Sequence, residues 1–413
     1  MKEKKLVVNT LYLYILSLVR MIFPLLTLPY LTRVLTVETY GVVVYIKSYM
    51  SYVQMILDYG FLLSATKNIA IAYNNKDNRK VEYILGNTII EKMILCFLSA
   101  IVTIALSYFI PIFKKELLFL WLYFLAISLS IFIADFLFRG IEKMEYITMP
   151  YIFAKIVFTI LTFLLIKGDK DLLLIPILEI INNVIIVIIS IFILKKLNIH
   201  FKFENLNKWI LDLKNSGIYF LSNFATTIFG SLTILIVGVV LDTKEVAFWS
   251  ICMQFVGVAK SLYSPICNSI YPYMVIEKDI KIIKRIQLLI LLPMIIGSIV
   301  VLLWGEEIIC FIGGVNYKEA GSIFKFLLPT VVVSFYSMLY GWPVLGALGR
   351  VKETTYSTII AAIIQLIGVI VIYKFNVFNL KMLAMTCNIS EILLLVVRWI
   401  YYKYYIKIQI QCI

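Results

Sequence analysis

The chain has 413 residues, of which 62% are hydrophobic and only 15% are charged, and its mean hydropathy is +0.97. Soluble domains contain about 45 to 50% apolar and about 25% charged residues, so this composition excludes a soluble protein and indicates a multi-pass membrane protein. The formal net charge of +14 does not indicate nucleic-acid binding, because the basic residues lie in short clusters between apolar runs.

The six cysteines are scattered without paired spacing, and the single histidine, His200, lies in a polar connector. This pattern favours neither disulfides nor a metal site, and the chain has no glycine-rich phosphate loop. We therefore expect no enzyme activity, no cofactor and no metal. The basic start at Met1 leads into a long apolar run without a small-residue cleavage site, which predicts a retained first span.

Apolar stretches of about 20 residues predict membrane-spanning helices. About twelve such stretches follow one another along the chain, so we expect an all-α integral membrane protein. They lie near residues 9–32, 39–63, 83–108, 117–137, 146–166, 171–194, 215–241, 246–271, 283–304, 322–346, 354–374 and 380–402.

The connectors between these stretches alternate in charge. Lys and Arg show a roughly two-to-one excess on the side that would hold both termini, which predicts cytoplasmic termini and an even number of spans. The longest hydrophilic connector falls midway along the chain. It predicts two six-helix lobes, residues 1–200 and 215–413, joined by a cytoplasmic linker at 201–214.

An internal repeat supports this division. When the second half is placed over the first at an offset of 206 residues, Asn9 meets Asn215 and Thr27 meets Thr233 without a gap. Because six spans bring the chain back to the same side, the two copies must run parallel, related by an axis along the membrane normal. Transporters are commonly built from such repeats.

Three cations lie inside predicted spans: Arg20, Lys47 and Lys260. Facing lipid, the three together would cost about 8 to 10 kcal/mol, so we expect them to line a water-filled interior. The alternative for the two lysines is that they extend toward the membrane surface or pair with a carboxylate.

Acidic residues in the spans are candidates for gating or coupling. Asp135 and Arg139 have the i,i+4 spacing of a helical ion pair. Asp58 could couple transport to protons or close a gate by pairing with a cation of the other lobe. Glu179 could bind sugar, but pairing with Lys155 in the preceding helix is the favoured interpretation.

Several short motifs stand out along the chain: PYLTRVL at 29–35, YG at 40–41, DYGF at 58–61, SATKNIA at 64–70, GIEKM at 140–144 and GALGR at 346–350. Together they resemble the Wzx family of O-antigen and capsule repeat-unit flippases, which belongs to the multidrug/oligosaccharidyl-lipid/polysaccharide exporter superfamily. The resemblance covers the whole chain in length and motif order, and the first hairpin is its most specific part.

The resemblance implies a transporter of undecaprenyl-diphosphate-linked oligosaccharide in the bacterial cytoplasmic membrane. It implies a MATE-like fold in which two lobes enclose a cavity that opens alternately to either side. Arg20, Lys47 and Lys260 best match the cavity arginines of related lipid II flippases, although two are lysines, which bind as point charges rather than bidentately. A polysaccharide polymerase and a chain-length regulator are implied partners.

Two other classes of function remain open from the sequence. A drug or cation exporter of the same superfamily would need a cavity with net negative charge, whereas the central charges here are mostly basic. A membrane polysaccharide polymerase or glycosyltransferase would need a large external loop or a cytoplasmic domain. The longest predicted connector has only about 20 residues, a length typical of simple linkers.

Overall fold

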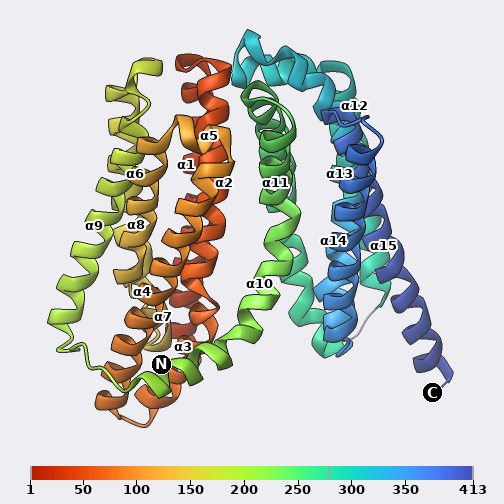
Figure 1. Ribbon diagram of the computed structural model, residues 1–413. Helices are drawn as coiled ribbons and strands as arrows, with labels where there is room; N and C mark the ends of the chain where they lie inside the picture. Colours follow the sequence, from red (N-terminus) through yellow and green to blue (C-terminus); the bar gives the residue numbers. More distant parts are fainter. Residues whose placement is uncertain (1, 278–279, 412–413) are drawn as a thin grey trace. The chain divides into compact units, whose positions relative to one another are not determined.

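The computed structural model describes residues 2–277 and 280–411, and within these ranges all regular structure is helical. The predicted all-α fold is thereby confirmed. The chain divides into two compact units, Met1–Thr227 and Ile228–Ile413, whose helices are labelled in Figure 1.

The first unit contains α1 (Lys2–Val34), α2 (Val37–Asp58), α3 (Phe61–Asn74), α4 (Asn78–Phe109), α5 (Pro111–Lys115), α6 (Leu117–Ser128), η1 (Leu129–Phe132), α7 (Asp135–Gly140), α8 (Glu145–Leu165), η2 (Asp169–Asp171) and α9 (Leu174–Lys196). Helix α10 (Leu206–Val240) runs from the first unit into the second. The second unit continues with α11 (Thr243–Glu277), α12 (Ile280–Gly313), η3 (Val315–Tyr317), α13 (Lys318–Leu339), η4 (Tyr340–Gly346), α14 (Val351–Lys374) and α15 (Leu380–Gln411).

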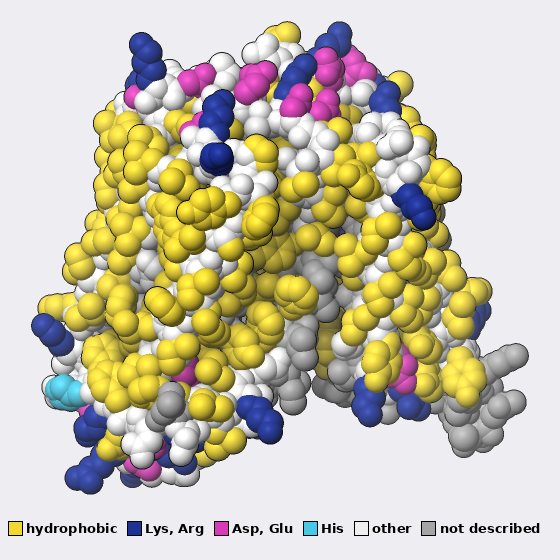
Figure 2. All heavy atoms as spheres, in the orientation of Figure 1, with side chains coloured by type: hydrophobic (Ala, Val, Ile, Leu, Met, Phe, Trp, Pro, Cys, Tyr) yellow, Lys and Arg dark blue, Asp and Glu magenta, His cyan; other side chains and the backbone are white. Residues whose placement is uncertain are grey.

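Ten helical segments among the described residues are long and apolar enough to cross a membrane. The predicted spans at 39–63 and 215–241 are not among them, so the count of twelve stays a prediction. In Figure 2, hydrophobic side chains cover the sides of the helices in each compact unit, and charged side chains gather toward the helix ends. This distribution is the one that a bilayer requires of a multi-pass membrane protein.

The turn between α1 and α2 is tied to the loop that follows α8. Thr36 caps α2 by accepting a hydrogen bond from the Thr39 backbone N–H at 3.3 Å, and its own N–H donates to Asp169 at 2.9 Å. The Tyr30 hydroxyl donates to the carbonyl of Ile166 at 2.7 Å. These bonds fix α1, α2 and α8 together at one end of the first unit.

The predicted fourth span is interrupted. After α6 the chain forms the short helix η1, passes through the extended residue Ile133, and begins α7 at Asp135. Asn183 of α9 supports the end of α6 by donating to the Ala126 carbonyl at 2.7 Å. No proline causes this break, whereas α1 stays helical through Pro24 and Pro29.

The connector after α9 packs onto the first turns of α4. Glu82 forms an ion pair with Lys202 at 2.6 Å, and Asn87 exchanges two hydrogen bonds with Glu204 at 2.7 and 2.9 Å. A Cβ on Gly86 would overlap the backbone of Lys202, so glycine permits this close approach. The boundary between the compact units then falls inside α10 rather than in the connector, and the predicted lobe boundaries stay a prediction.

The helical hydrogen bonding of the second unit is broken at two points, at Pro329 within α13 and at Gly341 within η4, and residues of α15 supply hydrogen bonds at both. Pro329 removes a backbone donor, and Asn388 accepts from the Thr330 N–H at 3.0 Å while donating to the Phe326 carbonyl at 2.8 Å. At the second break, Gly341 leaves helical geometry and Arg398 donates to the Ser337 carbonyl at 2.6 Å.

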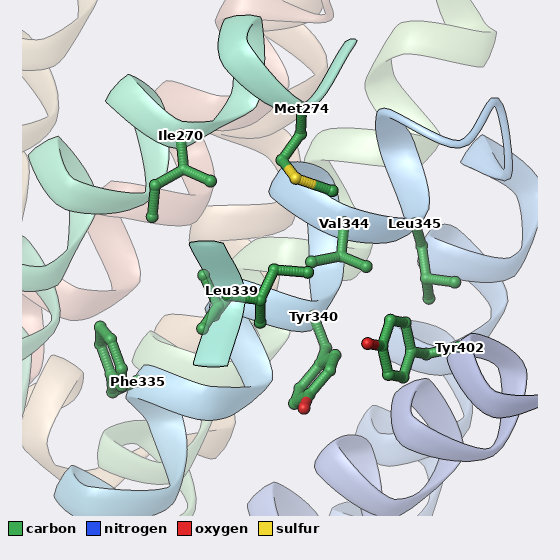
Figure 3. Close-up of a cluster of buried hydrophobic side chains, with 9 residues drawn as sticks. Ile270, Met274, Phe335, Leu339, Tyr340, Val344, Leu345 and Tyr402 are labelled. Carbon is green, nitrogen blue, oxygen red and sulfur yellow. The ribbon is translucent and has the colours of Figure 1, made fainter. Parts of the chain in front are cut away.

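Around the second break, a cluster of nine buried hydrophobic side chains joins α11, α12, α13, η4 and α15 (Figure 3). Its members are Ile270, Met274, Ile283, Phe335, Leu339, Tyr340, Val344, Leu345 and Tyr402. Close packing of this kind stabilises helices within a membrane, where lipid tails are as apolar as the side chains.

Candidate functional site: a charged cavity in the first unit

A cavity of about 550 Å³ lies within the first unit, lined by helices α1 to α4 and α6 to α9 together with η1. Five cations and three carboxylates line it, a formal excess of two positive charges. They are Arg20, Lys47, Lys92, Arg139, Lys155, Asp58, Asp135 and Glu179. Six of these are the residues of this unit that the sequence predicted as site residues.

Arg20 projects from the middle of α1 into this cavity. Its side chain is 50% exposed, its guanidinium lies 5.2 Å from the ring centre of Tyr151, and it pairs with Asp135 at a long 4.0 Å. Arg139 also acts on the charge of Asp135, and the predicted Asp135–Arg139 ion pair stays a prediction. The break before α7 makes Asp135 the first residue of that helix, where its carboxylate reaches α1.

Arg139 lines the same cavity one turn later in α7. Its Nε is buried and has no hydrogen-bond partner among the described residues. An unpaired guanidinium N–H in a low-dielectric site gains from any acceptor that enters, so Arg139 adds donor capacity beside Arg20.

Asp58 lies at the end of α2 and pairs with Lys92 of α4 at 3.0 Å. Gln54 donates to its other oxygen at 3.0 Å and accepts from Ser130 of η1 at 3.1 Å. The Lys92 side chain is only 7% exposed. Asp58 thus has a buried partner in its own unit, and its predicted roles, proton coupling or pairing with a cation of the other lobe, stay predictions.

Lys155 of α8 and Glu179 of α9 form an ion pair at 3.2 Å, and both side chains are more than 80% buried. This confirms the favoured interpretation that they satisfy each other between adjacent helices. On the next turn of α9, Asn182 donates to Asn183 at 3.0 Å. The buried Asn182 Oδ1 accepts no hydrogen bond from the described residues.

Lys47 differs from the other cavity lysines. It is exposed, and within the described parts of the chain no carboxylate oxygen lies within 4.0 Å of its Nζ. Glu179 and Lys155 are the nearest charges that act on it. Lys47 therefore has an ammonium group free to meet a ligand.

Lys260 belongs to the second unit, where it pairs with Glu391 of α15 at 2.9 Å. Glu391 is 6% exposed and also accepts from the Ser337 hydroxyl at 2.5 Å. The structure thus realises the alternative considered for Lys260, pairing with a carboxylate. No group of His, Cys, Asp and Glu suited to a metal occurs among the residues that the structure describes.

The family model for polysaccharide biosynthesis proteins matches residues 6–276, about two thirds of the chain. The chain belongs to this family. Two relatives provisionally named O-antigen transporters support the assignment over nearly full length. The one from Escherichia coli K12 is 25% identical over 404 residues, covering 94% of this chain and 96% of the relative, and the one from Shigella dysenteriae is 26% identical over 371 residues, covering 87% and 91%.

The fold of this polysaccharide biosynthesis protein is similar to that of solved membrane transporters. The lipid II flippase MurJ in an inward closed conformation has a TM-score of 0.71 at 14% identity, covering 96% of this chain and 87% of MurJ. An inward-facing multidrug resistance MATE family transporter of the MOP superfamily has a TM-score of 0.67 at 12% identity, covering 93% and 94%. At such identities the likeness shows the fold and confirms the predicted MATE-like class.

Sequence reasoning missed one buried cation of this family member. Arg398 has no predicted role, yet it is 8% exposed and donates to Ser337, Ser357 and Thr358. Arg398 lies near the end of an apolar run, where loop residues also lie. The local sequence therefore does not distinguish a buried arginine from a loop arginine. Only the break at Gly341 in η4 reveals the role of Arg398.

Proposed function

We propose that this protein is a flippase that moves undecaprenyl-diphosphate-linked oligosaccharide, an O-antigen or capsule repeat unit, across the bacterial cytoplasmic membrane by alternating access. The observation that carries the proposal is the cationic cavity of the first unit, which brings Arg20, Lys47 and Arg139 together inside a membrane-spanning bundle. Membership of the polysaccharide biosynthesis family and the names of the two relatives support it.

The cargo sets an electrostatic problem. A diphosphate and several sugars must cross about 30 Å of hydrocarbon, whereas the polyprenyl tail can stay in lipid. A cavity with polar walls and an excess of positive charge offers the head group a substitute for water. Cationic side chains then balance the diphosphate charge during the passage.

Arg20 is the residue best suited to hold the diphosphate. Half of its side chain is exposed to the cavity, and its 4.0 Å pairing with Asp135 is loose. An incoming phosphate can replace that carboxylate with two parallel N–H···O bonds, which a guanidinium forms and an ammonium does not. The unpartnered Nε of Arg139 offers a further donor.

The alternatives receive less support. Cationic drugs would be repelled by a cavity whose formal charge is +2, counted from its five cations and three carboxylates. A membrane polymerase would not account for the relatives, which are named as transporters. We further propose that both termini are cytoplasmic and that a polymerase and a chain-length regulator receive the product.

The test is an Arg20→Ala variant expressed in cells that lack the wild-type protein. We expect the variant to insert in the membrane at the normal level and surface polysaccharide to be lost. Arg20→Lys serves as the charge-matched control and should restore part of the export. Normal surface polysaccharide with Arg20→Ala would contradict the role given to Arg20.

A further inference from the structure

The charges of the cavity form two groups. The Arg20 group consists of Arg20, Lys92, Arg139, Asp58 and Asp135; the Lys47 group consists of Lys47, Lys155 and Glu179. Within each group the charges act on one another: Arg20, Arg139, Lys92 and Asp58 on Asp135, and Glu179 and Lys155 on Lys47. Each group has one more cation than it has carboxylates.

The two groups are displaced from each other along the helices. Helix α2 carries one member of each, and Lys47 precedes Asp58 by eleven positions, which corresponds to about 16 Å at 1.5 Å per residue. On α8, Tyr151 under Arg20 precedes Lys155 by four positions, about 6 Å. The two groups therefore follow one another along the cavity, and a ligand that contacts both lies along its length.

Uncharged polar side chains line the cavity beside these groups. Gln54 of α2 and Asn183 of α9 face it, and the buried Oδ1 of Asn182, a residue 2% exposed, has no partner among the described residues. A buried carbonyl oxygen without a donor is costly, and a sugar hydroxyl would satisfy it. The surroundings of the Lys47 group thus suit a glycan.

The cation types of the two groups also differ. The Arg20 group offers two guanidinium forks, which match the oxygens of a diphosphate, whereas the Lys47 group offers two ammonium groups, which act as point charges. Lys47 has no carboxylate within 4.0 Å in the described chain, so a neutral ligand would leave its charge unbalanced. A single carboxylate on the ligand would balance it.

We infer that the Lys47 group is a second anion site, which recognises the carboxylate of an acidic sugar in the cargo while the Arg20 group holds the diphosphate. This inference rests on the proposed flippase function and adds the substrate class, an oligosaccharide with an acidic sugar. Lys47 and Lys155 bind the carboxylate, and Glu179 keeps Lys155 in position through their ion pair.

The test compares two synthetic polyprenyl-diphosphate trisaccharides that differ only in a glucose or a glucuronate at the sugar end. The full-length protein is reconstituted in liposomes, and the transfer rate of each compound is measured. We expect the wild type to transfer the glucuronate compound faster. Lys47→Gln should reduce the glucuronate-to-glucose rate ratio about tenfold, the effect of losing roughly one charge-assisted contact, and Lys47→Arg should restore it.

The other outcomes separate this inference from the proposed function. If Lys47→Gln slows both compounds equally, Lys47 serves the diphosphate and the second site is disproved, while the flippase function stands. Equal wild-type rates that Lys47→Gln leaves unchanged also disprove the second site. If the folded wild type transfers neither compound, both proposals fall.

Thermal unfolding of each variant checks its fold, and Lys196→Gln, which changes an exposed residue at the end of α9, controls for the loss of a lysine charge elsewhere.

Discussion

Lys92 places an ammonium group in the first unit with only 7% of its side chain exposed, and Asp58 is its ion-pair partner at 3.0 Å. The Phe136 ring, 5.7 Å away, adds a cation–π contact but no negative charge. The stability of the region around Lys92 therefore depends on Asp58, because an unpaired buried charge is far more costly than a missing pair.

We predict that Asp58→Ala destabilises the protein by about 3 to 5 kcal/mol, because it leaves Lys92 buried without a counter-charge. Thermal unfolding in detergent would show this as a lowered midpoint. The double variant Asp58→Ala, Lys92→Met removes both charges and should recover much of the loss. An unfolding midpoint that Asp58→Ala leaves unchanged would contradict the pairing.

For single residues, the sequence predicts which charged side chains line the cavity better than it predicts their ion-pair partners. The cost of charge in a bilayer singled out Arg20, Lys47, Asp58, Asp135 and Glu179, and all five line one cavity. Their partners depend on which helices pack together, and a single sequence does not contain that information. At Asp135, for example, the i,i+4 spacing to Arg139 within α7 gives no sign of the contact with Arg20 of α1.

At the scale of helices and connectors, the connector after α9 is bound to helix α4 of the first unit. Its residues 200–204 bond to the first turns of α4 through Glu82 and Asn87, and Trp209 of α10 donates to Asn87 at 3.1 Å. Gly86 permits this contact because any larger residue would overlap Lys202. The start of α10 is thereby held on the first unit.

We predict that Gly86→Ala releases this connector, because the added methyl group displaces the backbone at Lys202 at a cost of about 1 to 3 kcal/mol. Limited trypsin digestion should cleave at the connector lysines several-fold faster than in the wild type. Gly297→Ala in α12 is the matched control, since an added Cβ there meets no atom within 4 Å. A connector as well protected in Gly86→Ala as in the wild type would refute the docking.

The interruptions of the helices show where element prediction from sequence ends. Hydropathy located the spans at 117–137 and 322–346, and the structure has long helical segments there. It did not locate the breaks at Ile133 and Gly341, because these depend on hydrogen bonds from neighbouring helices, such as those of Asn183 and Arg398. Prolines are no better guide, since α1 stays helical through Pro24 and Pro29.

For the whole molecule, composition and hydropathy were sufficient to predict an all-α membrane protein. The motifs, most specifically those of the first hairpin, predict a polysaccharide transport family. The family match shows a polysaccharide biosynthesis protein, and the likeness to solved transporters confirms the fold. Hydropathy alone does not fix the division into lobes or the count of twelve spans, because the apolar helices of a bundle have similar compositions. In the structure, the division between compact units falls within a helix, α10.

The central claim is that this protein carries the lipid-linked repeat unit from the inner to the outer leaflet. The most direct measurement is the accessibility of that repeat unit to an external glycosidase in spheroplasts of a strain that lacks the protein and has no other flippase. We predict that the repeat unit accumulates in a form the glycosidase cannot reach, and that restoring the wild-type protein exposes it within minutes. A repeat unit that is accessible without the protein would contradict the account.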